Sequence, residues 1–271
     1  MGLLEGKNAL IFGVANNRSI AWGITQAFQR EGANIGLSYA GPALERRVRR
    51  LADEIGCTFV EPCDVTQDDQ IEALVTKAKE HFGHIDILIH AVAYAEREDL
   101  ARPYYQTSRQ GFHTAMDVSV YSFTALARAF QPLMPKGGSL LTMTYYGGVK
   151  VVPHYNVMGV AKAALEASVR YLAYDLGKMG LRVNAISAGP IRTLSAAGIA
   201  GFRTLYKTIL DLSPLKEDIT IDDIGNAAVF LCSDMARRVT GEVLYVDAGY
   251  NVMGFPDPEA LENLIEKVAK P

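Results

Sequence analysis

The chain has 271 residues, 49% hydrophobic and 21% charged, which suits a soluble globular protein with a full core and no need of disulfides. Its formal net charge of −3 gives no sign of a nucleic-acid partner, and no apolar run reaches the roughly 18 residues of a membrane helix. Three cysteines without a CxxC pair or a Cys/His cluster argue against a metal site and favour a reducing, cytoplasmic setting.

Strand-length apolar runs alternate with helical patterns along the whole chain. The runs are Ala9–Phe12, Ile35–Tyr39, Thr58–Val60, Ile85–Ile89, Ser139–Met143, Val183–Ser187 and Val243–Val246. The helical patterns are Ile20–Glu31, Asp68–Phe82, Gly111–Phe130, Asn156–Lys178 and Ile221–Ser233. Several runs are continuously apolar, as expected of parallel strands covered on both faces. The alternation predicts an α/β fold: a single doubly wound Rossmann-type domain over residues 1–271, with a seven-stranded parallel sheet.

Two segments interrupt this alternation. The segment from Ala188 to about Leu215 follows the sixth strand and is rich in small residues. Its length predicts a substrate-binding lid or, equally, a packed helical excursion. The tail, residues 254–271, is expected to form a short amphipathic helix with a packing or subunit-contact role, because apolar residues recur at helical spacing at Leu261, Ile265 and Val268.

The first strand leads through Gly13 to a helix that begins after Ser19, at Ile20. A glycine at a strand end lets the backbone approach a phosphate, and a helix N-terminus supplies free N–H groups. No complete GxGxxG is present, so a plain strand–turn–helix is the alternative. This segment alone is a weak signal for a dinucleotide site.

Three later strand ends support a nucleotide site, since ligands of such sheets lie beyond the carboxyl ends of the strands. After the third strand, Asp64 is placed to accept from an adenine amino group beside Val65; the alternative is a helix N-cap, a role for which Thr66 is better placed. After the fourth, the segment around Val92 is small and apolar enough for a ribose and ring to pass. After the sixth, residues 190–193 offer backbone groups and a hydroxyl for a carboxamide and a pyrophosphate.

The end of the second strand, around Ala40, carries neither the acidic residue typical of NAD sites nor the arginine typical of NADP sites. Four arginines follow on a predicted helix, where a solvated face is the preferred interpretation: Arg46, Arg47, Arg49 and Arg50. The sequence therefore favours NADH, with NADPH as the less favoured alternative.

Tyr155 and Lys162 lie seven residues apart in a predicted helix, which is about two turns, so their side chains share one face. A nearby ammonium favours a phenolate, which would let Tyr155 give up a proton more readily near neutral pH. The alternative is two surface side chains of an amphipathic helix. The position of the pair after the fifth strand of a nucleotide-binding sheet favours a catalytic role.

Together these motifs resemble the short-chain dehydrogenase/reductase superfamily and, within it, the NADH-dependent enoyl-acyl-carrier-protein reductases, from Lys7 to about Met253. Most members of the superfamily have Tyr-x3-Lys and a serine on the fifth strand. Here the spacing is Tyr155-x6-Lys162, Tyr145 stands about where that serine would be, and Ser119 replaces a helix asparagine. These departures are those of the enoyl reductases and argue against carbonyl or alcohol chemistry.

The resemblance implies reduction of the trans-2 double bond of an enoyl-acyl-carrier-protein thioester by hydride from NADH, the final reductive step of fatty-acid elongation. A ketoreductase or alcohol dehydrogenase of the superfamily, and a silent nucleotide-sensing protein, remain the alternatives. By resemblance, Tyr155 hydrogen-bonds the developing enolate and Lys162 binds the nicotinamide ribose. Tyr145 lines the acyl site, unless it is only a packed aromatic.

The resemblance also assigns the remaining contacts. The cofactor contacts are Gly13, Ser19, Ile20, Ala40, Asp64, Val65, Val92, Lys162, Ile191, Arg192, Thr193, Leu194 and Ser195. The substrate contacts are Ala95, Tyr145, Tyr155, Met158, Ala196, Ile199, Phe202 and Tyr206. Two cations, Arg203 and Lys207, are expected to meet the acidic acyl-carrier protein, and the resemblance implies a homotetramer without a nucleic-acid or membrane partner.

Overall fold

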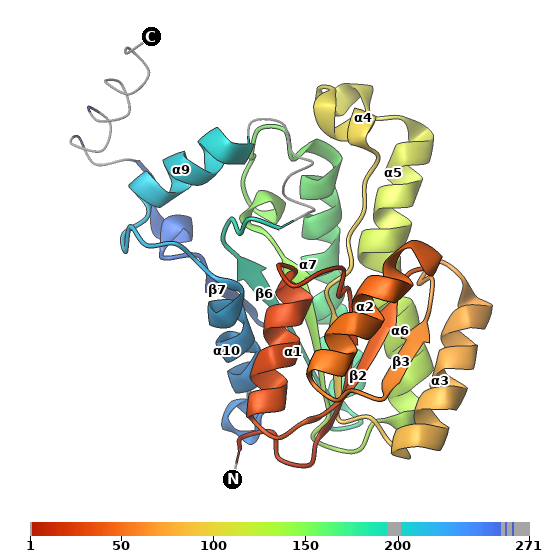
Figure 1. The fold of residues 1–271 in the computed structure, drawn as a ribbon. Coiled ribbons are helices and arrows are strands. Elements are labelled where there is room, and N and C mark those ends of the chain that lie inside the picture. Colours follow the sequence, from red (N-terminus) through yellow and green to blue (C-terminus); the bar gives the residue numbers. More distant parts are fainter. Residues whose placement is uncertain (1, 194–201, 256–257, 259–261, 263–271) are drawn as a thin grey trace.

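The structure, a computed structural model, describes residues 2–193, 202–255, 258 and 262, with the backbone only at residues 202 and 203 (Figure 1). Seven strands form one parallel sheet in the order β3-β2-β1-β4-β5-β6-β7, so the predicted fold class is confirmed. The strands are β1 (Asn8–Phe12), β2 (Asn34–Tyr39), β3 (Phe59–Pro62), β4 (Ile87–His90), β5 (Ser139–Thr144), β6 (Arg182–Ala188) and β7 (Val243–Val246).

Helices cover both faces of this sheet (Figure 1). The α-helices are α1 (Ile20–Arg30), α2 (Pro42–Glu54), α3 (Asp68–Phe82), α4 (Arg97–Ala101), α5 (Arg109–Met116), α6 (Ser122–Phe130), α7 (Asn156–Gly177), α9 (Phe202–Leu212) and α10 (Ile221–Cys232). The short 3₁₀ helices are η1 (Tyr104–Gln106), η3 (Gln131–Leu133), η4 (Tyr146–Gly148), η5 (Asp234–Ala236) and η6 (Tyr250–Val252). Within the described residues, no helix combines the length and apolar composition that a membrane-spanning segment requires.

The two core layers explain why the strands read as continuous apolar runs. In β1, Leu10 and Phe12 pack with α3, α6 and α7 on one face of the sheet. Ala9 and Ile11 pack with α1, α2 and α10 on the other face. Because successive side chains of a strand point to opposite faces, every residue of β1 is buried.

One predicted helix is interrupted. The apolar pattern over Gly111–Phe130 predicts a single helix, but residues Asp117–Tyr121 form a π-helix, η2, between α5 and α6. The widened turn contains Ser119, whose hydroxyl accepts from the Tyr94 amide at 3.0 Å and donates to the Tyr94 carbonyl at 3.1 Å. Such bulges are frequent near functional sites.

The segment after β6 contains α9, in which Tyr206 and Ile209 are buried. This favours the packed helical excursion for that part, while the lid function remains a prediction. The amphipathic helix expected within residues 254–271 lies almost entirely outside the described residues.

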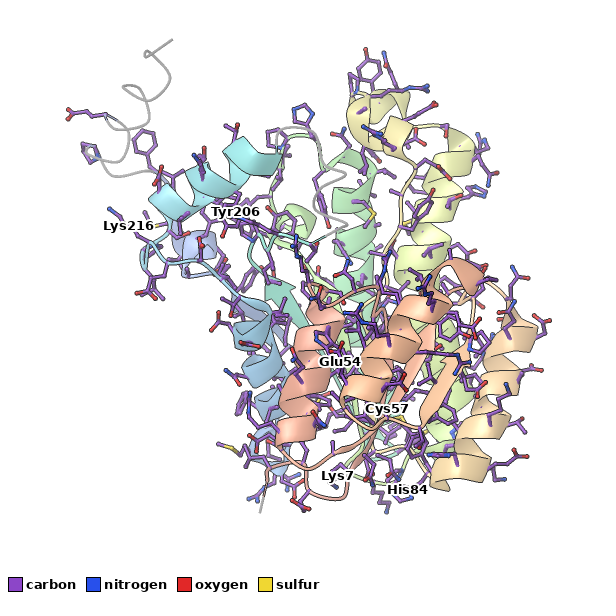
Figure 2. All side chains as sticks on the ribbon, in the orientation of Figure 1. Lys7, Glu54, Cys57, His84, Tyr206 and Lys216 are labelled. Carbon is purple, nitrogen blue, oxygen red and sulfur yellow. The ribbon has the colours of Figure 1, made fainter. Side chains whose placement is uncertain are left out.

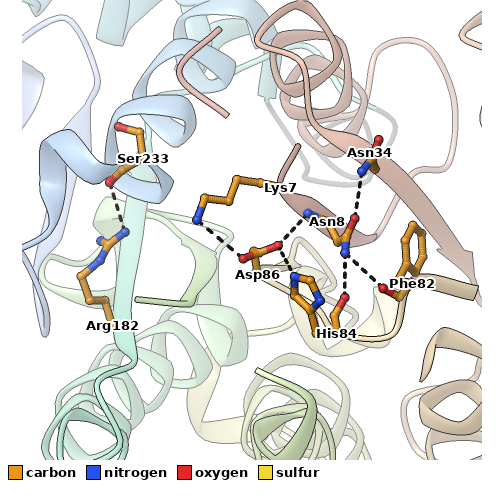
Figure 3. A network of polar contacts seen from close by, with 8 residues as sticks. All are labelled: Lys7, Asn8, Asn34, Phe82, His84, Asp86, Arg182 and Ser233. Carbon is orange, nitrogen blue, oxygen red and sulfur yellow. Dashed lines mark hydrogen bonds and ion pairs between the residues drawn. The ribbon is translucent and has the colours of Figure 1, made fainter. Parts of the chain in front are cut away.

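A polar network closes the amino ends of the strands (Figure 3). The Asp86 carboxylate accepts from the Asn8 amide at 2.9 Å and lies 3.6 Å from Lys7 Nζ and 3.2 Å from His84 Nε2. The Asn8 side chain accepts from Asn34 Nδ2 at 3.0 Å. Figure 2 shows Lys7 and His84 at this end of the molecule and Tyr206 at the other. The network occupies the amino end of the sheet with structural contacts, so the carboxyl end is where a ligand site is expected.

Candidate active site at the carboxyl end of the sheet

Gly13 directly follows β1, whose neighbour in the sheet is β4, and the strand order reverses between these two strands. Open α/β sheets bind their ligands at such a reversal. Gly13 has φ +105°, and a Cβ built on it would stand 2.1 Å from the carbonyl oxygen of Ala91. No other residue type fits this position, because the backbone of Ala91 occupies the space that a Cβ would need; the approach of a phosphate to Gly13 stays a prediction.

The N-terminus of α1 lies just beyond Gly13. Ser19 is the N-cap residue, and its hydroxyl donates to the carbonyl of Asn16 at 2.7 Å rather than capping the helix. The first turn, from the half-buried Ile20 onward, contains no acidic side chain. The helix dipole is therefore not neutralised there, which suits an approaching anion.

At the end of β3, Asp64 does not cap α3. Thr66 does not cap it either, so the expectation that Thr66 is the helix cap was wrong. The N-cap is Gln67, which makes no side-chain capping bond. Thr66 instead donates to Asp64 Oδ1 from its amide at 3.0 Å and from its hydroxyl at 2.8 Å. These bonds fix the Asp64 carboxylate at the strand end, while Val65 lies in the core, 6% exposed.

The four arginines of α2 are exposed, which confirms the solvated face expected for them. Arg49 and Arg50 pair with Glu45 and Glu54 one turn away, at 2.9 and 3.6 Å. Arg47 donates to the carbonyl of Ala15 at 3.3 Å and so ties α2 to the turn after β1. At the end of β2, Ala40 is exposed.

Tyr145 and Tyr155 form the aromatic centre of the site. Tyr145 follows β5 directly, Tyr155 precedes α7, and the two ring centroids lie 4.9 Å apart at 75°. The Tyr155 ring packs against Gly147, where a Cβ would come within 2.4 Å of it. Burial, more than the neighbouring groups, raises the pKa of both phenols above the usual value. Both therefore remain neutral hydrogen-bond donors, and the expectation that Lys162 lowers the pKa of Tyr155 was wrong.

Lys162 is buried in α7, and its Nζ donates to the carbonyl of Met143 at 2.8 Å. Burial lowers the pKa of Lys162 to about 8, and the charge of Glu166, one turn further along, works in the opposite direction. The Glu166 carboxylate accepts from the Thr144 hydroxyl at 2.7 Å, and burial raises its pKa. The ammonium is thus held at the carboxyl end of β5 and is still mostly charged at neutral pH.

His90, at the end of β4, is a buried group whose function the sequence did not predict. Its ring nitrogens lie 2.7 Å from Thr142 Oγ1 and 2.8 Å from Ser122 Oγ. Burial first, and the charge of Lys162 second, lower the pKa of His90 to about 3. The neutral imidazole therefore links β4, β5 and α6 below the site. Glu166 was also missed, although its spacing of four residues from Lys162 is a readable signal.

The substrate side of the site lies along the segment after β4. Val92 and Ala95 are half-buried, and Met158 Sδ lies 3.7 Å from the hydroxyl of Ser119. Ser119 in turn holds Tyr94, beside Ala95. These contacts bring Ala95 and Met158 to one region, between the segment after β4 and the start of α7.

On the other side of the site, Arg192 and α9 are in contact. The Arg192 guanidinium carbon lies 4.5 Å from the centroid of the Tyr206 ring, and burial raises the pKa of Tyr206. Ile191 and Thr193 are half-buried, and Lys207 is exposed. The predicted contacts Leu194, Ser195, Ala196 and Ile199, and the side chains of Phe202 and Arg203, lie outside the described residues.

Comparisons with known proteins agree with this geometry. A family model described as enoyl-(acyl carrier protein) reductase matches residues 13–251. The chain is 54% identical over 255 residues to the enoyl-[acyl-carrier-protein] reductase [NADH] FabI of Aquifex aeolicus (strain VF5), covering 94% of each chain. It is 52% identical over 259 residues to enoyl-[acyl-carrier-protein] reductase [NADH] 1 of Rhizobium meliloti (strain 1021), covering 96% of this chain and 95% of that one.

The fold agrees as closely as the sequence. The crystal structure of the Aquifex aeolicus reductase superposes with a TM-score of 0.92, covering 94% of this chain and 100% of that one. The similarity therefore spans the sheet, the tyrosine pair and the lysine together.

Proposed function

Because the chain belongs to the enoyl-[acyl-carrier-protein] reductase family, we propose that it reduces the trans-2 double bond of enoyl-acyl-carrier-protein thioesters with NADH. The reaction is the final reductive step of fatty-acid elongation. The observation that carries the proposal is the packing of Tyr155 against Tyr145 just after β5, the strand in which Met143 accepts the hydrogen bond from the Lys162 ammonium.

The residues at the strand ends fit a dinucleotide. Gly13 lets the chain after β1 pack directly against the backbone of Ala91 at the strand reversal, and the first turn of α1 carries no acidic side chain to repel a pyrophosphate. Asp64 presents a fixed carboxylate to an adenine amino group. Ser19 and Ile20 would contact the pyrophosphate, Ala40 and Val65 the adenosine, and Val92 the second ribose. The remaining contacts would come from Ile191, Arg192, Thr193, Leu194 and Ser195.

When bound, NADH supplies the hydride that is transferred to the β-carbon of the enoyl thioester. Negative charge then develops on the thioester oxygen, and uptake of a proton from solvent at the α-carbon would complete the reduction. Tyr155 donates a hydrogen bond to that oxygen, and since burial keeps the phenol protonated, the donor is present throughout the neutral pH range. The neutral, partly buried phenol of Tyr145 lines the acyl site beside it.

Lys162 holds the nicotinamide ribose and adds positive potential behind Tyr155. Its ammonium now donates to the carbonyl of Met143, and an ammonium has two further hydrogens for ribose hydroxyls. Glu166 helps to keep it charged. The acyl chain would lie along Ala95, Met158, Ala196, Ile199 and Phe202.

A ketoreductase or alcohol dehydrogenase is the alternative, and the residue after β5 counts against it. Tyr145 stands where such enzymes place a serine, and Tyr155 and Lys162 have the wider x6 spacing. The acyl-carrier protein is the proposed macromolecular partner, with Lys207 exposed on α9 as one of its contacts. Three free cysteines fit a reducing, cytoplasmic setting.

The test is an assay of NADH oxidation with paired substrates. We expect oxidation on addition of a trans-2-enoyl thioester and none with the matching β-ketoacyl thioester, and a lower rate with NADPH. Activity with the β-ketoacyl thioester and none with the enoyl thioester would overturn the proposal.

A further inference from the structure

The backbone on both sides of Tyr155 is strained. Four non-glycine residues in the described part of the chain have a positive φ, and two of them flank this tyrosine: His154 at +65° and Asn156 at +38°. Non-glycine residues avoid this region, which persists only where surrounding contacts impose it. The orientation of Tyr155 therefore depends on whatever holds its neighbours in place.

The side chain of Asn156 supplies such a contact. Its Nδ2 donates to the carbonyl oxygen of Leu100 at 2.7 Å and to that of Arg102 at 2.6 Å. Both acceptors are carbonyls, so the amide nitrogen, and not the amide oxygen, must face them. Both amide hydrogens are used, and two carbonyls at the end of α4 that have no partner within that helix are satisfied.

These two bonds connect Tyr155 to the substrate side of the site. Leu100 and Arg102 lie at the end of the segment that runs from Ala95 through α4, and α4 contacts α7 here. Asn156 is the first residue of α7, directly after Tyr155. A shift of the Asn156 anchor would turn the backbone of Tyr155 and move its ring relative to Tyr145 and Gly147.

We propose that Asn156 is a positioning residue, which fixes the Tyr155 hydroxyl by anchoring its strained backbone to the carbonyls of Leu100 and Arg102. The inference rests on the role proposed for Tyr155. It predicts that loss of the anchor lowers the rate of the chemical step and leaves the binding of NADH unchanged.

Two substitutions distinguish the effect of the Asn156 side-chain hydrogen bonds from the effect of its backbone conformation. Asn156→Asp has the same shape but places carboxylate oxygens against two carbonyls. Asn156→Gly keeps the left-handed backbone available and removes the side chain. Since misplacement of a reacting group by about 1 Å can cost on the order of 100-fold in rate, we expect kcat to fall at least tenfold in both variants. The Kd for NADH should stay within twofold in both.

The decisive experiment is a double-mutant cycle with Tyr155→Phe, measured as kcat with an enoyl thioester. If Asn156 acts through Tyr155, Asn156→Asp changes kcat by less than twofold in the Tyr155→Phe background. Asn226→Asp, which adds the same charge at an exposed residue of α10, is the matched control and should keep the wild-type kcat. Circular dichroism reports whether each variant is folded, and if Asn156→Asp is not, Asn156→Gly carries the cycle.

Three results would overturn the proposal. One is a wild-type kcat in both variants; another is equal losses of kcat with and without the Tyr155 hydroxyl. The third is an active Asn156→Gly beside an inactive Asn156→Ala, which would show that only the backbone conformation matters. The role of Tyr155 itself fails separately, if Tyr155→Phe alone keeps the wild-type kcat.

Discussion

Burial outweighs charge at two side chains that carry the proposed chemistry, Tyr155 and Lys162. The seven-residue spacing predicts that Tyr155 and Lys162 share a helix face, an arrangement in which an ammonium should stabilise a phenolate. Both groups are desolvated, however, and desolvation favours the neutral form of each, so the pKa of Tyr155 rises and that of Lys162 falls to about 8. Tyr155 is thus a hydrogen-bond donor, and not a pre-ionised acid.

Removing the Tyr155 hydroxyl should therefore remove a transition-state contact. We expect Tyr155→Phe to lower kcat by about 100-fold, in line with the loss of one oxyanion-stabilising donor, with a small effect on the Kd for NADH. Steady-state kinetics with an enoyl thioester and fluorescence titration with NADH measure the two quantities. A kcat within threefold of the wild type would contradict the role.

The lowered pKa of Lys162 predicts a pH-dependent affinity for NADH. The ammonium is present below about pH 8 and is lost as the pH rises through that value, so NADH binding should be constant below pH 8 and weaken above it. Lys162→Ala should raise the Kd about tenfold or more at pH 7, the cost of hydrogen bonds to a charged group. It should also abolish the pH dependence.

Glu166→Gln provides the matched variant for this titration. The amide retains an acceptor for the Thr144 hydroxyl but removes the charge that raises the pKa of Lys162. The decline in NADH affinity should then begin at a lower pH than in the wild type. An unchanged profile in Glu166→Gln, or an unchanged Kd in Lys162→Ala, would contradict the ribose role of Lys162.

Motif spacing predicts Gly13, Tyr155 and Lys162 because each belongs to a local pattern with a physical reason. It cannot predict His90 or Asn156. The hydrogen-bond partners of His90 come from β5 and α6, 52 and 32 positions away in the chain. Leu100, a partner of Asn156 in α4, is 56 positions away. Such contacts exist only once the chain has folded.

At the scale of whole elements, periodicity predicts where helices lie more reliably than how they are built. The pattern over Asp68–Phe82 predicts α3 with its observed bounds. The pattern over Gly111–Phe130 gives no sign of the π-helix around Ser119, because one wider turn hardly changes the apolar spacing. Strand β3 extends to Pro62, a residue that a central strand would not accept, because β3 is an edge strand.

The capping box of α10 offers a test of element stability away from the site. The Thr220 hydroxyl accepts from the Asp223 amide at 3.3 Å, and the Asp223 carboxylate accepts from the Thr220 amide at 2.8 Å. We expect Thr220→Ala to cost about 1 kcal/mol of unfolding free energy, seen as a Tm lower by a few degrees, with kcat unchanged. Thr76→Ala, at an exposed position inside α3, is the control and should not lower the Tm, because alanine is the better helix former there. Equal Tm shifts in the two variants would contradict the capping role.

At the scale of the whole molecule, η2 and α7 carry large aromatic side chains that are exposed in the single chain. Tyr121 is 47% exposed, Tyr171 is 75% exposed and Tyr174 is 69% exposed. Aromatic residues are typical of subunit interfaces. We propose that Tyr171 and Tyr174 belong to an interface of the homotetramer that the family resemblance implies.

Charges placed on this face should therefore dissociate the assembly. We expect the double variant Tyr171→Glu/Tyr174→Glu to reduce the molar mass found by light scattering from that of a tetramer to that of a dimer or monomer. Tyr105→Glu, at an aromatic residue of η1 that is 83% exposed, should leave the mass of a tetramer. If the double variant remains a tetramer, Tyr171 and Tyr174 do not lie in an interface that holds the subunits together. If the wild-type protein is a monomer, the proposed homotetramer is wrong.

The fate of the transferred hydrogen tests the central claim most directly. The protein would be given a trans-2-enoyl thioester and NADH deuterated at the transferable position of the nicotinamide, and the saturated product would be analysed by NMR and mass spectrometry. The account predicts one deuterium on the β-carbon and a hydrogen from solvent on the α-carbon. Recovery of a thioester that keeps its double bond would contradict the account. So would deuterium found on a carbinol carbon when a carbonyl substrate is supplied instead.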